Sequence, residues 1–69
     1  MDQQQNEADS DLIDEAEAAK ILNVSVFTLR NWRSKKRGPA WVKYPRAVRY
    51  RRSDLRVWLD ANTRSAFNA

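Results

Sequence analysis

Apolar residues recur at helical spacing in three segments of this 69-residue chain. In each segment they stand three or four positions apart, which predicts a helix with one inward face. The inward positions are Ala18, Ile21, Leu22, Leu29, Trp32, Leu55, Trp58 and Leu59. Between the second and third segments the period changes to two, because Val48 and Tyr50 alternate with Arg49 and Arg51. The sequence therefore predicts two short strands there, with one apolar face and one basic face.

The ends of the helices are marked by residues that can cap backbone groups. Asp14, Ser25 and Ser53 precede the three helical segments, and their oxygens are expected to accept the first N–H groups. Asp14 and Glu17 also have the spacing of a capping box. Asn23 suits the left-handed turn that ends a helix. The turn between the first two helices is so short that they must cross steeply, which is a helix-turn-helix.

The remaining breaks complete the predicted fold. Gly38-Pro39 ends the second helix, and Pro45-Arg46 is expected to turn between the two strands. Leu12 and Ile13 fit either a short strand or a hydrophobic staple before the first helix. The fold class is mainly α with a small β-hairpin, that is, three helices and two strands. The expected parts are an acidic disordered tail (1–11), a folded domain (12–62) and a short C-terminal tail (63–69).

Charge is divided unevenly along the chain. Residues 1–19 carry seven acids and no base, whereas residues 20–69 carry all 13 bases and two acids, so that 13 − 2 = +11. A compact domain with this balance attracts polyanions, and nucleic acid is the leading candidate partner. The acidic tail either solubilises the chain or covers the basic surface and weakens non-specific binding. A membrane surface ranks last as a partner, because the basic faces lack an accompanying apolar stripe.

Composition argues against several classes of function. The chain has no Cys and no His, so zinc and most other transition-metal sites are nearly excluded. Acid–base catalysis needs paired carboxylates or a His in a pocket, and a phosphate-binding loop needs more than one Gly. No enzyme activity, metal, cofactor or small-molecule ligand is expected. No membrane span and no signal peptide are apparent, which predicts a cytoplasmic protein.

The outward face of the second helix carries Phe27, Arg30, Asn31 and Ser34. Asn can pair bidentately with adenine, and a Phe ring can contact a thymine methyl group in the major groove. Arg30 and Arg33 are expected to reach phosphates from the sides. A solvated polar face is the plainer interpretation, but a ring at Phe27 has little use on such a face. Phe27 packed on a partner protein is a further alternative.

Five bases and no acid crowd the predicted hairpin: Lys43, Arg46, Arg49, Arg51 and Arg52. One or two charges would be explained as protection of an exposed strand edge. Five favour a contact of the hairpin with the minor groove or the DNA backbone. Arg46 lies at the turn and is the expected tip residue.

Aromatic residues suggest base stacking, as in single-strand binders. Trp32, Trp58 and Tyr50 instead fall on the predicted core positions, where a small domain needs large rings. Trp41 and Tyr44 fit either role. An RNA or single-strand binder therefore stays an alternative.

The order of these parts resembles the small excisionase-like helix-turn-helix family, which has a winged fold related to the MerR-type DNA-binding domain. The resemblance covers residues 12–62. The matching residues are Glu17-Ala18-Ala19, Leu22, Val24-Ser25, Thr28-Leu29, Trp32, Gly38-Pro39, Val48, Tyr50, Ser53-Asp54-Leu55 and Trp58-Leu59. The resemblance implies a winged helix-turn-helix whose second helix enters the major groove, while the hairpin wing meets the adjacent minor groove.

When the family's site residues are carried over by position, the residues that face the major groove are Phe27, Asn31 and Ser34. The resemblance assigns phosphate contacts to Ser25, Thr28 and Arg30, and the wing tip to Arg46. Two positions depart from the family pattern. Pro45 stands where the wing turn commonly has Gly, and residue 27 is usually polar or charged, so the base preference there should differ.

The resemblance also implies a biological role. Many members are recombination directionality factors, which bind adjacent sites cooperatively, bend DNA and direct a tyrosine integrase toward excision of a mobile element. The expected partners are double-stranded DNA, further copies of the chain along it and an integrase, in the bacterial nucleoid. Other members are small transcriptional regulators. A protein-interaction module that uses Phe27 and Phe67 is an alternative from another class.

Overall fold

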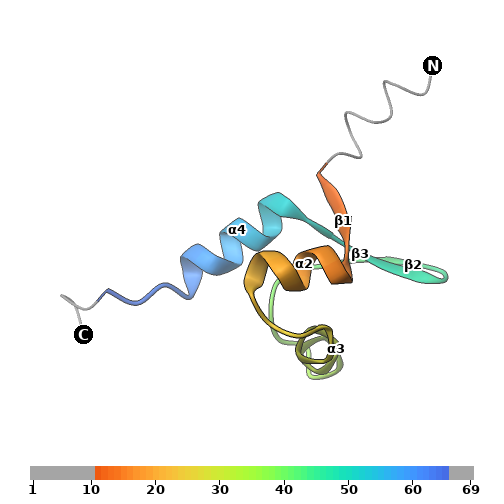
Figure 1. Cartoon of the computed structure of the whole chain (residues 1–69), viewed down its shortest axis with the longest axis horizontal. Coiled ribbons are helices and arrows are strands. Elements are labelled where there is room, and N and C mark those ends of the chain that lie inside the picture. Colours follow the sequence, from red (N-terminus) through yellow and green to blue (C-terminus); the bar gives the residue numbers. More distant parts are fainter. Residues whose placement is uncertain (1–10, 66–69) are drawn as a thin grey trace, which may run out of the picture.

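The computed structural model describes residues 11–65, which form three helices and a three-stranded antiparallel sheet (Figure 1). In chain order the elements are β1 (Leu12–Asp14), α2 (Glu15–Leu22), α3 (Val26–Ser34), β2 (Val42–Tyr44), β3 (Ala47–Arg51) and α4 (Arg52–Ala61). The predicted fold class is confirmed: the arrangement is that of a winged helix-turn-helix. The predictions for residues 1–10 and for Phe67 lie outside the described residues.

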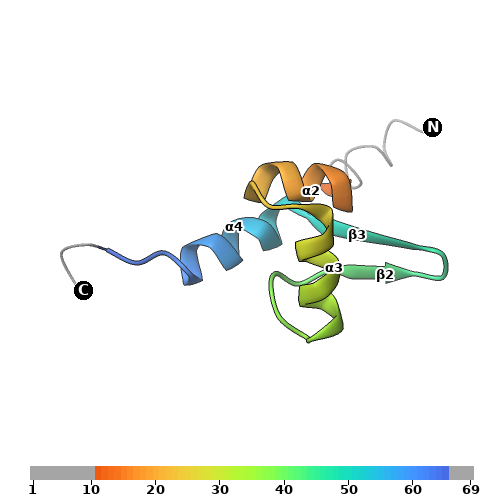
Figure 2. The same cartoon turned by 60° about the horizontal axis from the view of Figure 1, so that its bottom comes forward.

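The sheet contains one strand more than the predicted hairpin. Its order is β1-β3-β2, so that β3 pairs with β2 to form the wing and with β1 on its other edge. Leu12 and Ile13 therefore form a strand, with Ile13 opposite Tyr50 in the register. Figure 2 shows the β2–β3 hairpin extending away from the helices.

The wing turn contains only Pro45 and Arg46, between Tyr44 and Ala47. Among the described residues, positive φ values occur at Asn23, Lys36 and Gly38, and not in this turn. A two-residue hairpin loop without positive φ is neither type I′ nor type II′. The turn is consistent with the type I turn that Pro45 predicts.

The turn between α2 and α3 follows the prediction closely. The Asp14 carboxylate caps α2 by accepting the Glu17 N–H at 2.9 Å. Asn23 adopts a left-handed conformation with φ of 59°, and the Val24 N–H donates to the Ala19 carbonyl at 3.0 Å. These bonds end α2 and leave three residues, Asn23 to Ser25, before α3 begins.

Helix α3 ends before the predicted Gly38-Pro39 break. Lys36 takes a positive φ of 59°, and the Arg37 N–H donates to the Trp32 carbonyl at 2.7 Å. Gly38 then has a φ of 84°, and a Cβ placed on it would lie 2.7 Å from the Trp32 ring. The single glycine is therefore required for the backbone to pass close to this ring.

The core lies between the sheet and all three helices. Its buried apolar residues are Ile13, Ala18, Ala19, Leu29, Tyr50 and Leu55. The rings of Trp32 and Trp58 lie 5.1 Å apart between centroids, so α3 and α4 meet through these two side chains.

Two residues predicted to point inward are exposed: Ile21 by 41% and Leu59 by 39%. The prediction was wrong for them because both side chains line an open groove between α2 and α4, and α4 extends beyond the body of the domain (Figure 1). The apolar stripe identifies a helix face, but it does not show how far a neighbouring element covers that face.

The start of α4 corrects the prediction that Ser53 caps it. The helix begins at Arg52, and no side chain caps it from the N-cap position, Arg51. Asp11 instead accepts hydrogen bonds from the Ser53 hydroxyl at 2.9 Å and the Ser53 N–H at 3.3 Å. Asp11, which was assigned to the tail, thus caps a helix 42 residues later in the chain.

Candidate nucleic-acid interface

The outward face of α3 carries three exposed side chains at the predicted positions: Phe27, Asn31 and Ser34. The Phe27 side chain is 76% exposed, which is unusual for so large an apolar ring. Leu29 and Trp32 turn toward the core on the other side of the helix, and so they fix which face is free.

Ser25 and Thr28 stand at the N-terminus of α3. The Ser25 hydroxyl oxygen accepts the Thr28 N–H at 3.0 Å and lies 3.0 Å from the Thr28 hydroxyl. Ser25 is therefore the N-cap of α3, as the sequence predicted. The positive end of the helix dipole favours an anion beside these two hydroxyls.

Arg30 is held at its guanidinium by Glu15, the first residue of α2. Its Nη2 donates to Glu15 Oε2 at 2.7 Å, and its Nε lies 3.2 Å from the same oxygen. The Arg30 side chain remains 55% exposed. Its guanidinium carbon lies 6.0 Å from the centroid of the Phe27 ring. Arg30 thus links Glu15 to the outward face of α3.

Arg33 occupies a more enclosed position than its predicted phosphate role requires. Its side chain is only 16% exposed, and its Nη2 lies 3.2 Å from Glu15 Oε1. Its Nη1 donates to the Tyr50 hydroxyl at 2.9 Å, and its guanidinium carbon lies 5.6 Å from the Trp41 ring centroid. Arg33 joins α2, α3 and β3, and Trp41 is its cation–π partner.

Glu15 is the acid at the centre of these contacts. The hydrogen bond from Arg30 lowers the pKa of Glu15 below its ordinary value, with a smaller contribution from Arg33, while desolvation opposes both. Glu15 in turn raises the pKa of Arg30. Glu15 is therefore ionised near neutral pH and compensates part of the positive charge of α3.

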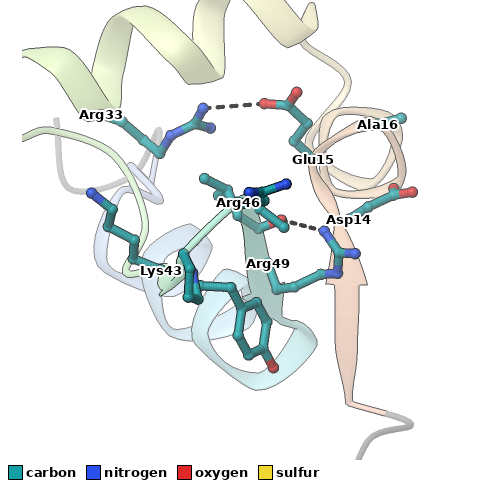
Figure 3. Close-up of a pocket in the computed structure, with 11 residues that line it drawn as sticks. Asp14, Glu15, Ala16, Arg33, Lys43, Arg46 and Arg49 are labelled. Atoms are coloured by element: carbon teal, nitrogen blue, oxygen red, sulfur yellow. Dashed lines mark hydrogen bonds and ion pairs between the residues drawn. The ribbon is translucent and has the colours of Figure 1, made fainter.

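A groove of about 540 Å³ lies between the start of α2, Arg33 of α3 and the wing (Figure 3). The residues that line it are Asp14, Glu15, Ala16, Arg33, Lys43, Tyr44, Pro45, Arg46, Ala47, Val48 and Arg49. Within residues 11–65, Lys43 and Arg46 form no ion pair, and both are exposed. The wing thus supplies uncompensated charge to this groove.

Arg49 and Arg51 differ from these two bases. Successive residues of a strand point to opposite faces, so both arginines lie on the face opposite Val48 and Tyr50. Arg49 lines the edge of the groove, where its Nη1 donates to the Val48 carbonyl at 2.8 Å. Arg51 does not line the groove, and its Nη1 lies 3.6 Å from Asp54 Oδ2.

Two features of this surface were not predicted from the sequence. The role of Glu15 was missed because its partners, Arg30 and Arg33, follow 15 and 18 residues later. The exposed bases Lys35, Lys36 and Arg37 follow α3, and the last two line a second groove of about 480 Å³. Three consecutive bases directly after the predicted groove-facing helix were a signal in the sequence for a further basic surface.

The described part of the chain offers little for other classes of site. Within residues 11–65, no three acidic residues come together in a way that could hold a metal ion. No helix of this part is long and apolar enough to cross a membrane.

Comparison with known proteins supports the interpretation of the fold. A search of curated proteins finds no match to the chain. A family model described as "Helix-turn-helix domain" matches residues 12–63, which is nearly all of the described part. Helix-turn-helix domains bind DNA, and this family includes excisionase-like DNA-binding proteins. With its three helices, its wing and this match, the chain belongs to the helix-turn-helix domain family.

Proposed function

We propose that this chain binds double-stranded DNA sequence-specifically, with α3 in the major groove and the wing against the adjacent minor groove or backbone. One observation carries the proposal. An exposed set of Phe27, Asn31 and Ser34 lies on the outward face of α3, and the uncompensated bases Lys43 and Arg46 lie on the wing. The major groove admits one helix, and base edges there distinguish all four pairs.

The arrangement favours separate roles for the site residues. Asn31 is proposed to read an adenine, with Phe27 and Ser34 contacting neighbouring base edges. Lys43 and Arg46 are proposed to contact phosphates, as are Ser25 and Thr28 at the start of α3. These contacts release counterions, which makes the affinity dependent on salt.

Three arginines receive revised roles in this proposal. Arg49 is proposed as a minor backbone contact at the edge of the groove. Arg33 is proposed to position α3 against the sheet, since its guanidinium already contacts Glu15, Tyr50 and Trp41. Arg51 is proposed to stabilise the start of α4 through Asp54, because it lies outside the groove.

We propose an architectural role rather than catalysis, most closely that of an excisionase. Several copies would bind adjacent sites, bend the DNA and direct a tyrosine integrase toward excision of a mobile element, in the cytoplasm. Contacts by α3 and the wing to neighbouring grooves would offset the cost of bending. A transcriptional regulator of such an element is the second candidate, because it would use the same surface.

A gel-shift titration tests DNA binding and role together. The full chain is titrated on duplex containing the attachment region of a candidate element and on random duplex of equal length, at two salt concentrations. Stepwise, cooperative shifts on attachment DNA, with weaker and more salt-dependent binding to random DNA, are expected. A single shift at a promoter-like site favours the regulator. No shift at low salt contradicts DNA binding and favours a protein-interaction module.

An excision assay in cells separates the two roles. The integrase is supplied with and without this chain, and excision of the element is measured. Excision that depends on the chain is the expected result. Excision that is unaffected, with altered transcription of the element, would assign the chain to regulation. Competition by single-stranded DNA or RNA that equals competition by duplex would instead indicate a single-strand binder.

A further inference from the structure

Glu15 is placed where it competes with DNA for Arg30. Its two carboxylate oxygens receive Nη2 and Nε of Arg30 at 2.7 to 3.3 Å. A phosphate group accepts a guanidinium fork in the same bidentate manner. A phosphate that binds this Nε–Nη2 edge of Arg30 must therefore replace Glu15, and only the Nη1–Nη2 edge of Arg30 stays open to other anions.

Glu15 also determines where the Arg30 guanidinium lies. Arg30 extends from α3 and is 55% exposed, so without a partner it would move freely in solvent. With Glu15 on one side, its guanidinium carbon lies 6.0 Å from the Phe27 ring centroid on the outward face of α3. The contact holds the charge beside the proposed base-reading residues.

We infer that Glu15 is a specificity-determining residue, which acts by withholding Arg30 from phosphates that any duplex offers. The inference rests on the proposed DNA-binding function. On random duplex, Arg30 contributes little because Glu15 offsets its charge and occupies its Nε–Nη2 edge, so a bidentate phosphate contact through that edge must first break the Glu15 contact. On the target duplex, α3 is seated in the groove, and base contacts by Phe27 and Asn31 supply the binding that Arg30 does not.

The matched control is Glu17, on the same helix. Glu17 is exposed, and its side chain forms no ion pair with another residue of 11–65. Glu15→Gln and Glu17→Gln each remove one negative charge from α2, so they change the long-range electrostatic attraction of DNA similarly. Only Glu15→Gln releases Arg30.

The test compares the wild-type chain, Glu15→Gln and Glu17→Gln on two duplexes. One is enriched by the wild-type chain from a random duplex library, and the other is a random duplex. Glu15→Gln is expected to bind random duplex about two- to fivefold more tightly than Glu17→Gln does, as for loss of a half-exposed ion pair. Its preference for the enriched duplex should fall by a similar factor. Equal effects of the two variants would overturn the inference.

A double-mutant cycle identifies Arg30 as the released group. In an Arg30→Ala background, Glu15→Gln should no longer differ from Glu17→Gln on random duplex. A difference that persists would overturn the assignment. If Glu15→Gln unfolds, Glu15→Asp serves instead, because its shorter side chain keeps the charge but loses reach to Arg30. Glu15→Asp should also raise binding to random duplex, and unchanged binding would overturn the inference.

The outcomes separate this inference from the proposed function. If the wild-type chain enriches no sequence and binds no duplex, the DNA-binding function fails and the inference fails with it. If the chain selects a duplex but the two Gln variants behave alike, the DNA-binding function stands and only the role of Glu15 is refuted.

Discussion

Helix α3 and the β2–β3 wing both present basic residues beside the same groove, but they hold them differently. On α3, Arg30 and Arg33 contact Glu15, and Arg33 also contacts Tyr50. On the wing, Lys43 and Arg46 are exposed and have no ionic partner within residues 11–65.

The difference indicates separate roles for the two elements: α3 holds its side chains in a fixed geometry, and the wing supplies charge. Side chains held by packing and hydrogen bonds keep one arrangement, which is what discrimination between base pairs requires. Long basic side chains without fixed partners can adjust to a phosphate backbone of any sequence. We therefore expect changes on α3 to alter specificity and changes on the wing to alter affinity and its salt dependence.

The largest effect should follow from truncating a buried side chain that packs α3 against the core. Leu29 is fully buried on this helix, and Leu29→Ala is expected to lower the free energy of unfolding by about 2–5 kcal/mol. That loss is a large share of the stability of a small domain. Urea denaturation measures it. Val57→Ala, at an exposed apolar position of α4, is the control and should change little.

A smaller and more local effect is expected at Asn31, on the exposed face of α3. Asn31→Ala should cost about 1–3 kcal/mol of binding free energy at one base position and leave stability unchanged. Binding constants on duplexes with each base pair substituted in turn would measure this cost. Equal losses on target and random duplex would remove Asn31 from base readout and weaken the contrast with the wing.

Arg46 tests the expected role of the wing in affinity. Arg46→Ala should weaken binding to every duplex by a similar factor and reduce the salt slope by about 1. Titrations at several salt concentrations, on target and random duplex, measure both quantities. Unchanged binding at moderate salt would show that the wing tip does not contact DNA. A sequence-dependent loss would instead give the wing a part in specificity.

The smallest expected effect concerns pH and the Glu15 contacts. Arg30 lowers the pKa of Glu15 in the folded state, so the ionised form stabilises the fold. This contribution is present above the pKa of Glu15 in the unfolded chain and is lost as the pH falls through the lowered folded value. The stability difference between the wild-type chain and Glu15→Gln should therefore shrink in acid. A constant difference would show that the ion pair contributes nothing.

Local signals in the sequence predicted most of the fold, and they failed where distant residues decide. Asp14, Asn23 and Ser25 act on backbone groups within five positions, so short patterns identified their roles. The predicted cap of α4 was wrong, because the side chain that caps this helix belongs to Asp11, 42 positions before Ser53. The positive φ of Lys36 could not be predicted from its residue type, because lysine rarely adopts positive φ.

The same distinction applies to the candidate interface. Helical spacing alone separated the exposed Phe27 and Asn31 from the buried Leu29. It could not show that Arg33 is enclosed, because its partners come from other elements, 17 and 18 positions away in the chain. Side-chain direction on one helix is a local property, whereas the partner of a charged group depends on how the elements are packed.

The contacts of Asp11 have a consequence for how the domain opens. Its carbonyl accepts the Arg52 N–H at 2.8 Å, and its carboxylate accepts the Ser53 N–H at 3.3 Å. The first described residue is thereby tied to the first turn of the last helix, so neither end can fray without releasing the other. Amide hydrogens of Arg52 and Ser53 should then become accessible to solvent together, when the contacts of Asp11 break.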